Sequence, residues 1–427
     1  MSSRRTLLVL TRHTPLPWED GAGAYLFDIL RYLHRRGFSV HVAWLAPHDH
    51  LRWQGVWTLP ADFASVVHLH APGAIRLGRR LVFPAVYWQP FKARMLSRVK
   101  AALASVGLRV GRGSHPPSVG TSPGEPADPA QSSTWMATPS PAEHAFAARL
   151  IARLRPSSLV ANYAWMTPLF GDSPAGRLPR RLCLHPDVAW KRAEQLARLS
   201  GSEPEITRSG EAALLRHAAT IVGISALDVA ELRALAPAAD VLLAPKSVLP
   251  DPAPPAPGDS ARILFVGSGN SFNAAGLTWF LEDIWPAIRA ALPHAELDVC
   301  GSVAAAVAAR PPGVRFHGAV PDLSPFYRDT ALVVVPLPHA TGLNIKLVDA
   351  AARGRAIVTT PATLAGAPFL RDAVAAADDA PGFAAATIGL LGDRPARHRL
   401  AARALAAVAE HLSPDACYAP LAAALEQ

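Results

Sequence analysis

The sequence contains few cysteines, and they lack the spacing that cysteine-based sites need. Cys183, Cys300 and Cys417 lie far apart in the 427-residue chain, and each sits among apolar residues. This pattern excludes a disulfide framework and suggests no metal site. It favours a protein of the reducing cytoplasm.

Long apolar runs are also missing. No stretch approaches the roughly 20 uninterrupted apolar residues that a transmembrane helix needs. The N-terminal "MSSRRTLLVL" places two arginines before an apolar run, as a secretion signal does. However, "TLLVL" is too short for a signal core, and no small-residue cleavage site follows it. The segment therefore predicts a first β-strand.

Acidic residues are outnumbered by basic ones. Forty-two Lys and Arg against 33 Asp and Glu give a formal charge of +9, which favours anionic partners such as nucleotides or acidic headgroups. No zinc finger, aromatic RNA-binding signature or basic helix is present, so nucleic acid is not a predicted partner. With 50% apolar residues the chain can bury large cores, and its length predicts two domains.

The first part of the chain alternates strand and helix patterns. "TLLVL" reads as a strand, residues 21–36 as a helix, and "FSVHVAWLA" as a second strand. Gly37 follows the helix, where a C-terminal glycine is expected. The short apolar segments "SVVHLH", "SLVANY", "RLCLH" and "TIVGIS" continue the pattern of a parallel sheet that is covered on both faces.

Two stretches interrupt this alternation. Residues 111–140 are rich in Gly, Pro, Ser, Thr and Ala, which predicts a flexible insertion. Residues 247–262, "SVLPDPAPPAPGDSAR", are proline-rich and predict a semi-rigid linker. Strand and helix patterns then restart with "RILFVGSG", a helix at 274–291, "AELDVCG", "VRFHGAV" and "ALVVVPL". Two tandem α/β domains of this kind place a ligand beyond the carboxyl ends of their strands.

The segment "TGLNIKLVDAAARGRAIVTT" carries the clearest site pattern. Gly342 allows the backbone to approach an anion at the start of a helix, and Lys346 can add a point charge. Asp349, three residues later, projects from the same side and can accept hydrogen bonds from a ribose diol. A second interpretation stays open, in which Lys346 and Asp349 form an ordinary surface ion pair.

The same segment resembles the nucleotide-binding signature of retaining GT-B glycosyltransferases of the family-4 group. The blocks "FVGSGNSFNAAGLTWFLEDIWPAI", "LDVCGS" and "VRFHGAV" follow that group in order and spacing, as do "LTRHTPLPWEDGAGAYLFDILRYLHRRGFSVHVAW", "LCLHPDVAWKRAEQ" and "TIVGISALDVAEL". The resemblance covers nearly the whole chain apart from the insertion and the linker. It implies an α/β fold of GT-B architecture, with two Rossmann-like doubly wound domains that face a central cleft.

Domain limits follow from this resemblance. Residues 1–246 would form the N-terminal acceptor domain, which contains the insertion, and 247–262 the linker. Residues 263–410 would form the nucleotide-sugar-binding domain. Residues 411–427 would be a C-terminal helix that packs back on the first domain.

The resemblance also implies a set of site residues. Those assigned a catalytic part are His185, Asp187 and Lys346. Those assigned to donor binding are Gly267, Gly269, Asn270, Thr341, Gly342, Leu343, Asn344, Lys346 and Asp349. Those assigned to an acceptor or cleft loop are Gly21 and Gly23.

Plainer interpretations stand beside several of these assignments. A glycine pair before a helix is also a simple packing turn, and a histidine after a strand is often a structural residue such as a hydrogen-bonded core imidazole. The sequence also departs from the family pattern at two places. Thr341 replaces the first of two glutamates, and the usual Arg and Lys pair after the first strand of the second domain is absent. Lys346 would then carry more of the diphosphate charge.

The implied function is a retaining, metal-independent, hexosyltransferase-like glycosyltransferase of polysaccharide biosynthesis without a cofactor. Its partners would be a nucleotide sugar and a glycan or lipid-linked acceptor, and the basic charge would allow peripheral membrane association at the inner face. The lack of an Asp-x-Asp motif agrees with metal independence. The alternatives are a nucleotide-sugar-binding regulator without transferase activity, and a GT-B-like epimerase or phosphorylase.

Overall fold

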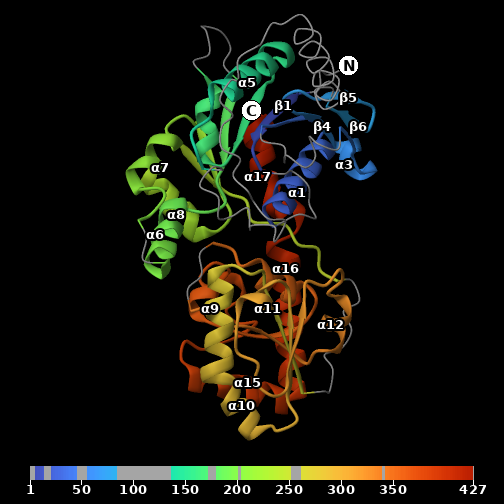
Figure 1. Cartoon of the computed structure of the whole chain (residues 1–427), viewed down its shortest axis with the longest axis vertical. Coiled ribbons are helices and arrows are strands. Elements are labelled where there is room, and N and C mark those ends of the chain that lie inside the picture. The colour runs from blue at the N-terminus through green and yellow to red at the C-terminus, as the bar shows by residue number, and fades with distance from the viewer. Residues whose placement is uncertain are drawn as a thin grey trace, which may run out of the picture. The chain divides into compact units, whose positions relative to one another are not determined.

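The computed structural model describes residues 5–13, 21–45, 55–83, 136–171, 179–200, 203–251, 261–338 and 342–426. The chain divides into two compact units, residues 1–179 and 180–427. Figure 1 follows the elements along the chain by colour. The predicted linker is described at 247–251 and 261–262, and most of the predicted insertion lies outside the described residues.

Within the described residues, the first sheet has seven strands in the order β10-β9-β8-β7-β1-β2-β4. The pairs β1–β2, β1–β7, β2–β4, β8–β9 and β9–β10 are all parallel. Its strands are β1 (Thr6–Thr11), β2 (Ser39–Trp44), β4 (Val67–His70), β7 (Ser158–Asn162), β8 (Arg180–Leu184), β9 (Thr220–Gly223) and β10 (Asp240–Leu243). The predicted strands at the start of the chain are therefore confirmed.

Helices that accompany this sheet are α1 (Gly21–Arg35), α5 (Pro141–Leu154), η2 (Ala164–Phe170), α6 (Ala189–Ser200), α7 (Arg208–Leu215) and α8 (Ala226–Leu235). The apolar spacing of α1 places Leu26, Ile29 and Leu30 in the core, each at most 1% exposed. The helix ends at Gly37, whose φ of 91° closes it as predicted.

A three-stranded antiparallel ribbon in the first unit was not predicted. It consists of β3 (Val56–Thr58), β5 (Ile75–Leu77) and β6 (Arg80–Val82), in the order β3-β6-β5, and α3 (Ala61–Val66) lies between β3 and β5 in the chain. Its strands have three residues each, which is too short for an alternating apolar pattern to stand out.

In the part of the chain that the structure describes, the second sheet has six strands in the order β13-β12-β11-β14-β15-β16, and every pair in it is parallel. Its strands are β11 (Arg262–Val266), β12 (Glu296–Cys300), β13 (Val314–Gly318), β14 (Leu332–Val335), β15 (Ala356–Thr359) and β16 (Ala375–Ala376). Two parallel sheets with helical crossovers make two Rossmann-like domains, as predicted.

The helices around the second sheet are α9 (Ser271–Trp279), η3 (Phe280–Ile284), α10 (Trp285–Ala291), α11 (Val303–Ala306), α12 (Ser324–Asp329), α13 (Ile345–Ala352), α14 (Pro361–Leu364), η4 (Pro368–Leu370), α15 (Ala380–Gly392), α16 (Arg394–His411) and α17 (Pro414–Glu426). In Figure 1, α9 and α10 form one yellow column. The column contains a π-helical turn at η3, because Pro286 has no N–H and its ring excludes a regular i−4 contact.

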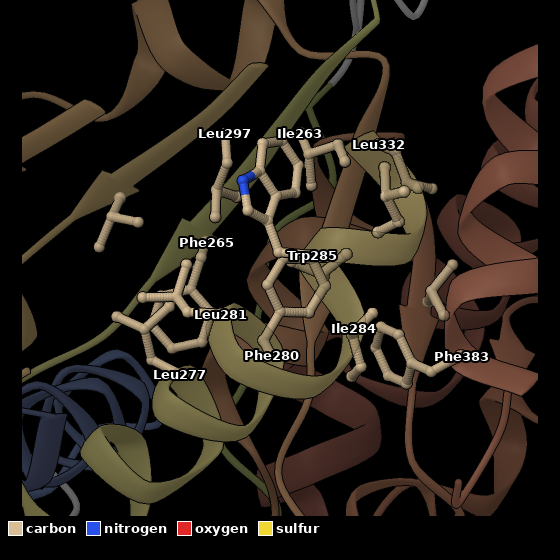
Figure 2. Close-up of a cluster of buried hydrophobic side chains, with 14 of the residues drawn as sticks. Ile263, Phe265, Leu277, Phe280, Leu281, Ile284, Trp285, Leu297, Leu332 and Phe383 are labelled. Carbon is tan, nitrogen blue, oxygen red and sulfur yellow. The ribbon is translucent and has the colours of Figure 1, made fainter. Parts of the chain in front are cut away.

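The core of the second domain is built around Trp285. Figure 2 shows its indole beside Ile263, Leu297 and Leu332, with Phe383 approaching from α15. Trp285 is 1% exposed, and its Nε1 donates to the Pro312 carbonyl at 3.1 Å. A buried aromatic ring of this size stabilises the fold, while the hydrogen bond avoids an unpaired donor.

Helix α17, at the C-terminal end of the second unit, is hydrogen-bonded to two other parts of that unit. Ser247 N donates to the Tyr418 hydroxyl of α17 at 2.8 Å, and Arg180 Nη1 donates to the Ala424 carbonyl. Helix α17 also contacts β10. Cys183, Cys300 and Cys417 are buried and free. No helix within the described ranges is both long and apolar enough to cross a membrane.

Candidate functional site

The segment that opens α13 follows the second sheet's β14. Asn344 caps the helix, because its side-chain oxygen accepts a hydrogen bond from Leu347 N at 3.3 Å. Leu347 and Val348 are fully buried, which turns Lys346 and Asp349 toward the partly exposed side of the helix. Leu343 is buried just before the cap, whereas Thr341 lies outside the described residues.

Gly342 has a backbone that only glycine adopts easily. Its φ is 64°, and a Cβ at Gly366 would lie 1.9 Å from the Gly342 carbonyl oxygen. The two glycines therefore permit a close passage of two backbone segments. A Cβ placed on Gly342 itself would lie 3.2 Å from Asp228 Oδ2 and 3.5 Å from Asp187 Oδ1. This glycine thus faces two carboxylates of the same compact unit.

Lys346 is held from the side of α9. Its Nζ donates to Asn273 Oδ1 at 2.8 Å, and Asn273 in turn donates to the Ser268 carbonyl at 2.8 Å. Burial lowers the pKa of Lys346 to about 8, against the opposing effect of the Asp349 charge. The amine therefore donates to Asn273, and the charge of Asp349 acts on it as well.

Asp349 lies in the field of several cations. Burial raises the pKa of this carboxyl, and the charges of Lys246, Arg353 and Lys346 act in the opposite direction. A partly buried carboxylate with three cations around it has both acceptor oxygens and local positive potential. Such a group can bind hydroxyls that are attached to an anion.

The glycine loop after β11 is already well bonded. Gly267 N donates to the Cys300 carbonyl at 2.9 Å, and Gly269 N donates to Ser302 Oγ at 2.8 Å. These two amides are therefore not open donors for a ligand in this structure. Asn270 caps α9 by accepting from Asn273 N at 2.9 Å. The loop's contribution to the site is thus to hold Asn273, and through it Lys346.

His185 follows β8 and is completely buried. Its Nε2 and Glu211 Oε1 lie 2.5 Å apart, and both side chains are 0% exposed. Glu211 also accepts from Ala189 N at 3.0 Å and Trp190 N at 2.6 Å, at the start of α6. Burial would raise the pKa of Glu211, but the His185 hydrogen bond and charge and these two amides lower it overall.

Two further carboxylates lie near His185 in this part of the second unit. Asp187 pairs with Arg192 Nη1 at 3.1 Å, and Ser225 Oγ donates to Asp228 Oδ2 at 2.5 Å. Burial is the main reason why the pKa of Asp228 rises to about 6, and repulsion from Asp187 adds to it, while the Ser225 hydrogen bond opposes it. Carboxylates in this position can accept hydrogen bonds from sugar hydroxyls.

Trp190 presents an unusual polar atom beside this network. Its indole Nε1 is buried and has no hydrogen-bond partner among the described residues. The ammonium of Lys191 lies 5.6 Å from the ring centroid. A buried donor of this kind is normally satisfied, so Trp190 is an exception to that rule.

In the first unit, Gly21 and Gly23 open α1, and a Cβ at Gly21 would meet no atom within 4 Å. At the carboxyl ends of β1 and β7, His13 stacks on Tyr163 at 5.4 Å, and Tyr163 stacks on Trp165 at 4.6 Å. Tyr163 has a φ of 74°, which is rare for an aromatic residue. This stack is a strained, preformed feature that the sequence did not reveal.

Residues 260–393 match the family model described as Glycosyl transferases group 1. The matched region contains the loop at 267–270, Asn273, Gly342 and α13. No curated protein matches the chain in sequence at a significant level. The family match and the fold together support a transferase.

Solved structures with the same fold cover essentially the whole chain. Sucrose-phosphate synthase from Thermosynechococcus elongatus has a TM-score of 0.63 at 15% identity, over 99% of this chain and 98% of that chain. Anabaena HepE in complex with UDP-glucose has a TM-score of 0.59 at 11% identity, over 99% and 100%. Staphylococcus aureus TarM, in a mutant complex with fondaparinux, alpha-GlcNAc-glycerol and UDP, has a TM-score of 0.65 at 7% identity, over 99% and 100%. The chain therefore has the fold of GT-B glycosyltransferases.

Several residues of this site were missed in the sequence. Glu211 and Asp228 lie in helices that read as ordinary amphipathic segments, and Asn273 reads as one polar residue of a helix start. Their contacts join residues that are distant in the sequence. Asn273 and Lys346, for example, are 73 residues apart, and the residues next to them give no sign of the contact. Only the dense grouping of small polar residues in "GSGNSFN" hinted that this helix start has a special geometry.

Proposed function

We propose that the chain is a retaining glycosyltransferase that moves a sugar from a nucleoside-diphosphate sugar to a hydroxyl group. The observation that carries the proposal is the Lys346 ammonium, which Asn273 fixes beside Asp349 at the start of α13. The match of residues 260–393 to Glycosyl transferases group 1 supports it. The Anabaena neighbour that is bound to UDP-glucose supports this class of donor.

Lys346 would stabilise the departing diphosphate. The reaction breaks the bond between the anomeric carbon and the diphosphate, so negative charge grows on the leaving oxygen. With a pKa of about 8, Lys346 is mostly protonated at neutral pH, and an incoming diphosphate would raise that pKa further. The amine already has a fixed orientation, so little reorganisation is needed during the reaction.

Asp349 would recognise the ribose of the donor. Its carboxylate can accept hydrogen bonds from two adjacent hydroxyls, and Lys246 and Arg353 lie close enough to affect its charge. Asp349 is one methylene shorter than the glutamate of the family pattern, so the ribose would sit closer to the helix. Leu343 and Asn344 would shape the start of the same helix.

His185, Asp187 and Asp228 would serve the transferred sugar. In this proposal Glu211 holds the imidazole of His185 in one orientation, and the two aspartates accept hydrogen bonds from sugar hydroxyls. Gly342, which these aspartates face, would let the sugar and the diphosphate pass close to the backbone. No covalent nucleophile and no metal ion are part of the proposal.

The acceptor would be a glycan, a lipid-linked saccharide or another envelope precursor, and the protein would act in the cytoplasm. One neighbour, WaaG, is described as a glycosyltransferase involved in lipopolysaccharide biosynthesis, with a TM-score of 0.52 at 15% identity. Its involvement in lipopolysaccharide biosynthesis supports an envelope precursor as the acceptor in this proposal.

A screen of nucleoside diphosphates and their sugars by thermal shift, followed by calorimetry, tests the donor site. We expect one diphosphate to stabilise the wild-type protein and Lys346→Ala to weaken its binding by at least about tenfold. NMR of the product would then show an anomeric configuration identical to that of the donor. Binding without diphosphate release across a panel of donors and acceptors would identify a regulator instead, and a donor whose sugar is inverted at another carbon would identify an epimerase.

A further inference from the structure

Three histidines lie together on one face of the first sheet. The parallel register pairs His41 of β2 with His68 of β4, and His70 lies two residues further along β4, so the three side chains project from the same face. The ring of His41 stacks on that of His68, with 4.8 Å between centroids, and on that of His70, with 5.3 Å. Within the described residues, β4 is an edge strand of this sheet.

A continuous series of hydrogen bonds runs through this cluster. Nη2 of Arg153, in the last turn of α5, lies 3.3 Å from Nδ1 of His70. Nε2 of His70 lies 3.0 Å from Nδ1 of His41, and Nε2 of His41 lies 3.3 Å from Oγ of Ser39. These four residues, called the histidine chain below, connect the C-terminal end of α5 to strands β4 and β2.

The guanidinium determines the direction of every bond in the histidine chain. Arginine has N–H donors and no acceptor, so Nδ1 of His70 must accept and carries no proton. The proton of this imidazole is then on Nε2, which donates to Nδ1 of His41. By the same reasoning the proton of His41 is on its Nε2, which donates to Ser39. Both imidazoles are therefore neutral, and the intact chain has no place for another proton.

A further proton breaks one of these bonds. On Nδ1 of His70 it would face the guanidinium of Arg153, and on Nδ1 of His41 it would face the Nε2–H of His70. In either case a hydrogen bond is replaced by a contact between two donors, and positive charge is added to a partly buried cluster.

The charges around the two imidazoles oppose protonation as well. His68 of β4, Arg76 of β5 and Arg153 of α5 act on both of them, and His34 of α1 acts on His68. Within the described residues, each of these groups is a cation or becomes one on protonation. Asp62, in the first turn of α3, is exposed and is not among the charges that act on the cluster.

These surroundings set the pH range in which the cluster changes. Burial is the main reason why the pKa of His41 and that of His70 fall to about 4, and the neighbouring positive charges add to it. The ordinary value is 6.5, so an opened or unfolded chain binds more protons than the closed one between these two values. The closed state therefore loses stability as the pH falls from about 6.5 to about 4.

The other end of α5 is held by a contact that mild acid does not disturb. Nε of Arg12 lies 2.7 Å from Oε1 of Glu143, in the first turn of α5. Burial would raise the pKa of Glu143, but hydrogen bonds from Arg12 and Ser140 lower it to about 2. Acid therefore acts on the C-terminal end of this helix before it acts on the N-terminal end.

We propose that the histidine chain is a pH switch. At neutral pH it holds the C-terminal end of α5 at the edge of the first sheet, and protonation of His41 or His70 in mild acid releases that end. Three imidazoles can also bind a metal ion, but the described residues contain no group of His, Cys, Asp and Glu that could hold one. The switch lies in the first unit, and its action does not depend on the proposed transferase activity.

NMR of the full chain with ¹⁵N-labelled histidine tests the direction of the bonds. We expect His41 and His70 to be Nε2–H tautomers at pH 7 and to titrate with midpoints close to pH 4. The single variants His41→Gln and His70→Gln assign the two signals. An Nδ1–H tautomer at either position, or a midpoint near 6.5, would contradict the proposed chain.

Hydrogen exchange of residues 148–154 and 67–70, corrected for the intrinsic effect of pH, tests the release of α5. In the wild type, protection should fall by roughly tenfold or more between pH 7 and pH 5. His41→Gln/His70→Gln keeps polar side chains that do not titrate in this range, so protection should no longer change with pH. His144→Gln/His217→Gln, at two exposed histidines, is the matched control and should behave as the wild type.

Arg153→Met provides a second variant, at an exposed position where folding is not at risk. It removes the donor to His70 and one of the charges that lower the pKa of that imidazole, so the His70 midpoint should rise and protection of residues 148–154 should fall at both pH values. Arg149→Met, also exposed and on the same helix, should change neither.

Three results of the exchange experiment would overturn the switch. The first is equal wild-type protection at pH 7 and pH 5. The second is a loss of protection in acid that persists in His41→Gln/His70→Gln. The third is saturable binding of Zn²⁺ at pH 7 that this double variant abolishes, because the imidazoles would then be metal ligands.

Discussion

Nζ of Lys346 on α13 and Oδ1 of Asn273 on α9 lie 2.8 Å apart, so two helices that follow different strands share one polar contact. Asn273 is 2% exposed and also bonds to the Ser268 carbonyl. The lysine is therefore oriented by a residue that is itself fixed from both sides. The following predictions begin with this pair.

Replacing Asn273 should disturb donor binding through Lys346. In Asn273→Ala the ammonium loses its acceptor and becomes mobile, so we expect the Kd for nucleoside diphosphate to rise by about tenfold. Asp379→Ala is the matched control. It removes the cap of α15, with a loss of about 1 kcal/mol in stability, at a residue that has no part in the proposed site. Calorimetry and urea unfolding measure the two effects. Equal Kd values in both variants would remove Asn273 from the site.

The lowered pKa of Lys346 determines how stability and affinity for a diphosphate change with pH. Its folded pKa of about 8 lies below the ordinary value of 10.5, so the unfolded chain binds more protons between these pH values. Stability should therefore rise as the pH rises from about 8 to about 10.5. Affinity for a diphosphate should fall over the same range, because the ammonium becomes neutral.

Lys346→Met should abolish both of these trends, whereas Lys191→Met, at a more exposed position, should preserve them. Urea unfolding and calorimetry at several pH values provide the measurement. A wild-type affinity that stays constant up to pH 10 would show that another group supplies the charge.

Asp228→Asn should stabilise the protein at neutral pH. Burial raises the pKa of Asp228 to about 6 from 3.8, so the folded chain binds more protons between these values and loses stability as the pH rises through them. The amide avoids this penalty, and we expect a gain on the order of 2 kcal/mol at pH 8 and little gain at pH 4.

Chemical unfolding of Asp228→Asn at both pH values checks this, with Asp283→Asn at an exposed position as the control. If Asp228 accepts hydrogen bonds from the sugar, turnover should fall although stability rises. A variant that is stabilised equally at both pH values would contradict the assigned pKa.

The passage between Gly342 and Gly366 should be intolerant of any side chain. Gly366→Ala would place a methyl group 1.9 Å from a backbone oxygen, and we expect a loss of more than about 3 kcal/mol. Gly342→Ala meets side-chain atoms at 3.2 Å and a φ of 64°, so a loss of about 1 kcal/mol is expected.

Gly389→Ala on α15 provides the contrast, since nothing lies within 4 Å of its added Cβ. A helix-interior alanine there should stabilise by about 0.5–1 kcal/mol. Thermal unfolding ranks the three variants, and a stable Gly366→Ala protein would mean that the two backbones can separate.

Replacing Glu211, the carboxylate that is hydrogen-bonded to His185, should strongly destabilise the protein. Glu211→Ala leaves the imidazole and the amides of Ala189 and Trp190 without their acceptor in a fully buried site, so we expect a loss of about 3–5 kcal/mol. Glu211→Gln keeps one acceptor and should fold, with a lower kcat and an unchanged Kd for nucleoside diphosphate. Unchanged kcat in a folded Glu211→Gln protein would assign this pair to structure alone.

The sequence predicted most of the fold because its signals are local. The strands around Leu8 and Phe265 are short apolar runs, and Gly37 ends α1 with the positive φ that its position requires. The glycine turn at Gly342 also placed Lys346 on the helix that follows it, whereas the capping role of Asn344 was not predicted. The ribbon was missed because its strands of three residues leave no periodic pattern.

The partners within the site could not be predicted in the same way. Glu211 meets His185 across 26 residues, and Asp228 approaches Gly342 only because two separate parts of the second unit pack together. Such contacts depend on tertiary packing, and nothing in the neighbouring sequence marks them. The assignments of His185, Asp187, Lys346, Asp349 and the glycine loop to particular ligand groups remain predictions.

The π-helical turn between α9 and α10 lets the two ends of this helical column contact different parts of the domain. Asn273 before the turn contacts Lys346, and Trp285 after it packs in the core. A π-helical turn contains one more residue than an α-helical turn. It therefore rotates the side chains that follow it about the helix axis, relative to those that precede it. Asn273 at one end and Trp285 at the other can therefore each point where they are needed. Deleting one residue from Phe280–Ile284 would restore a uniform spiral, and the amide and the indole could then no longer both reach their partners.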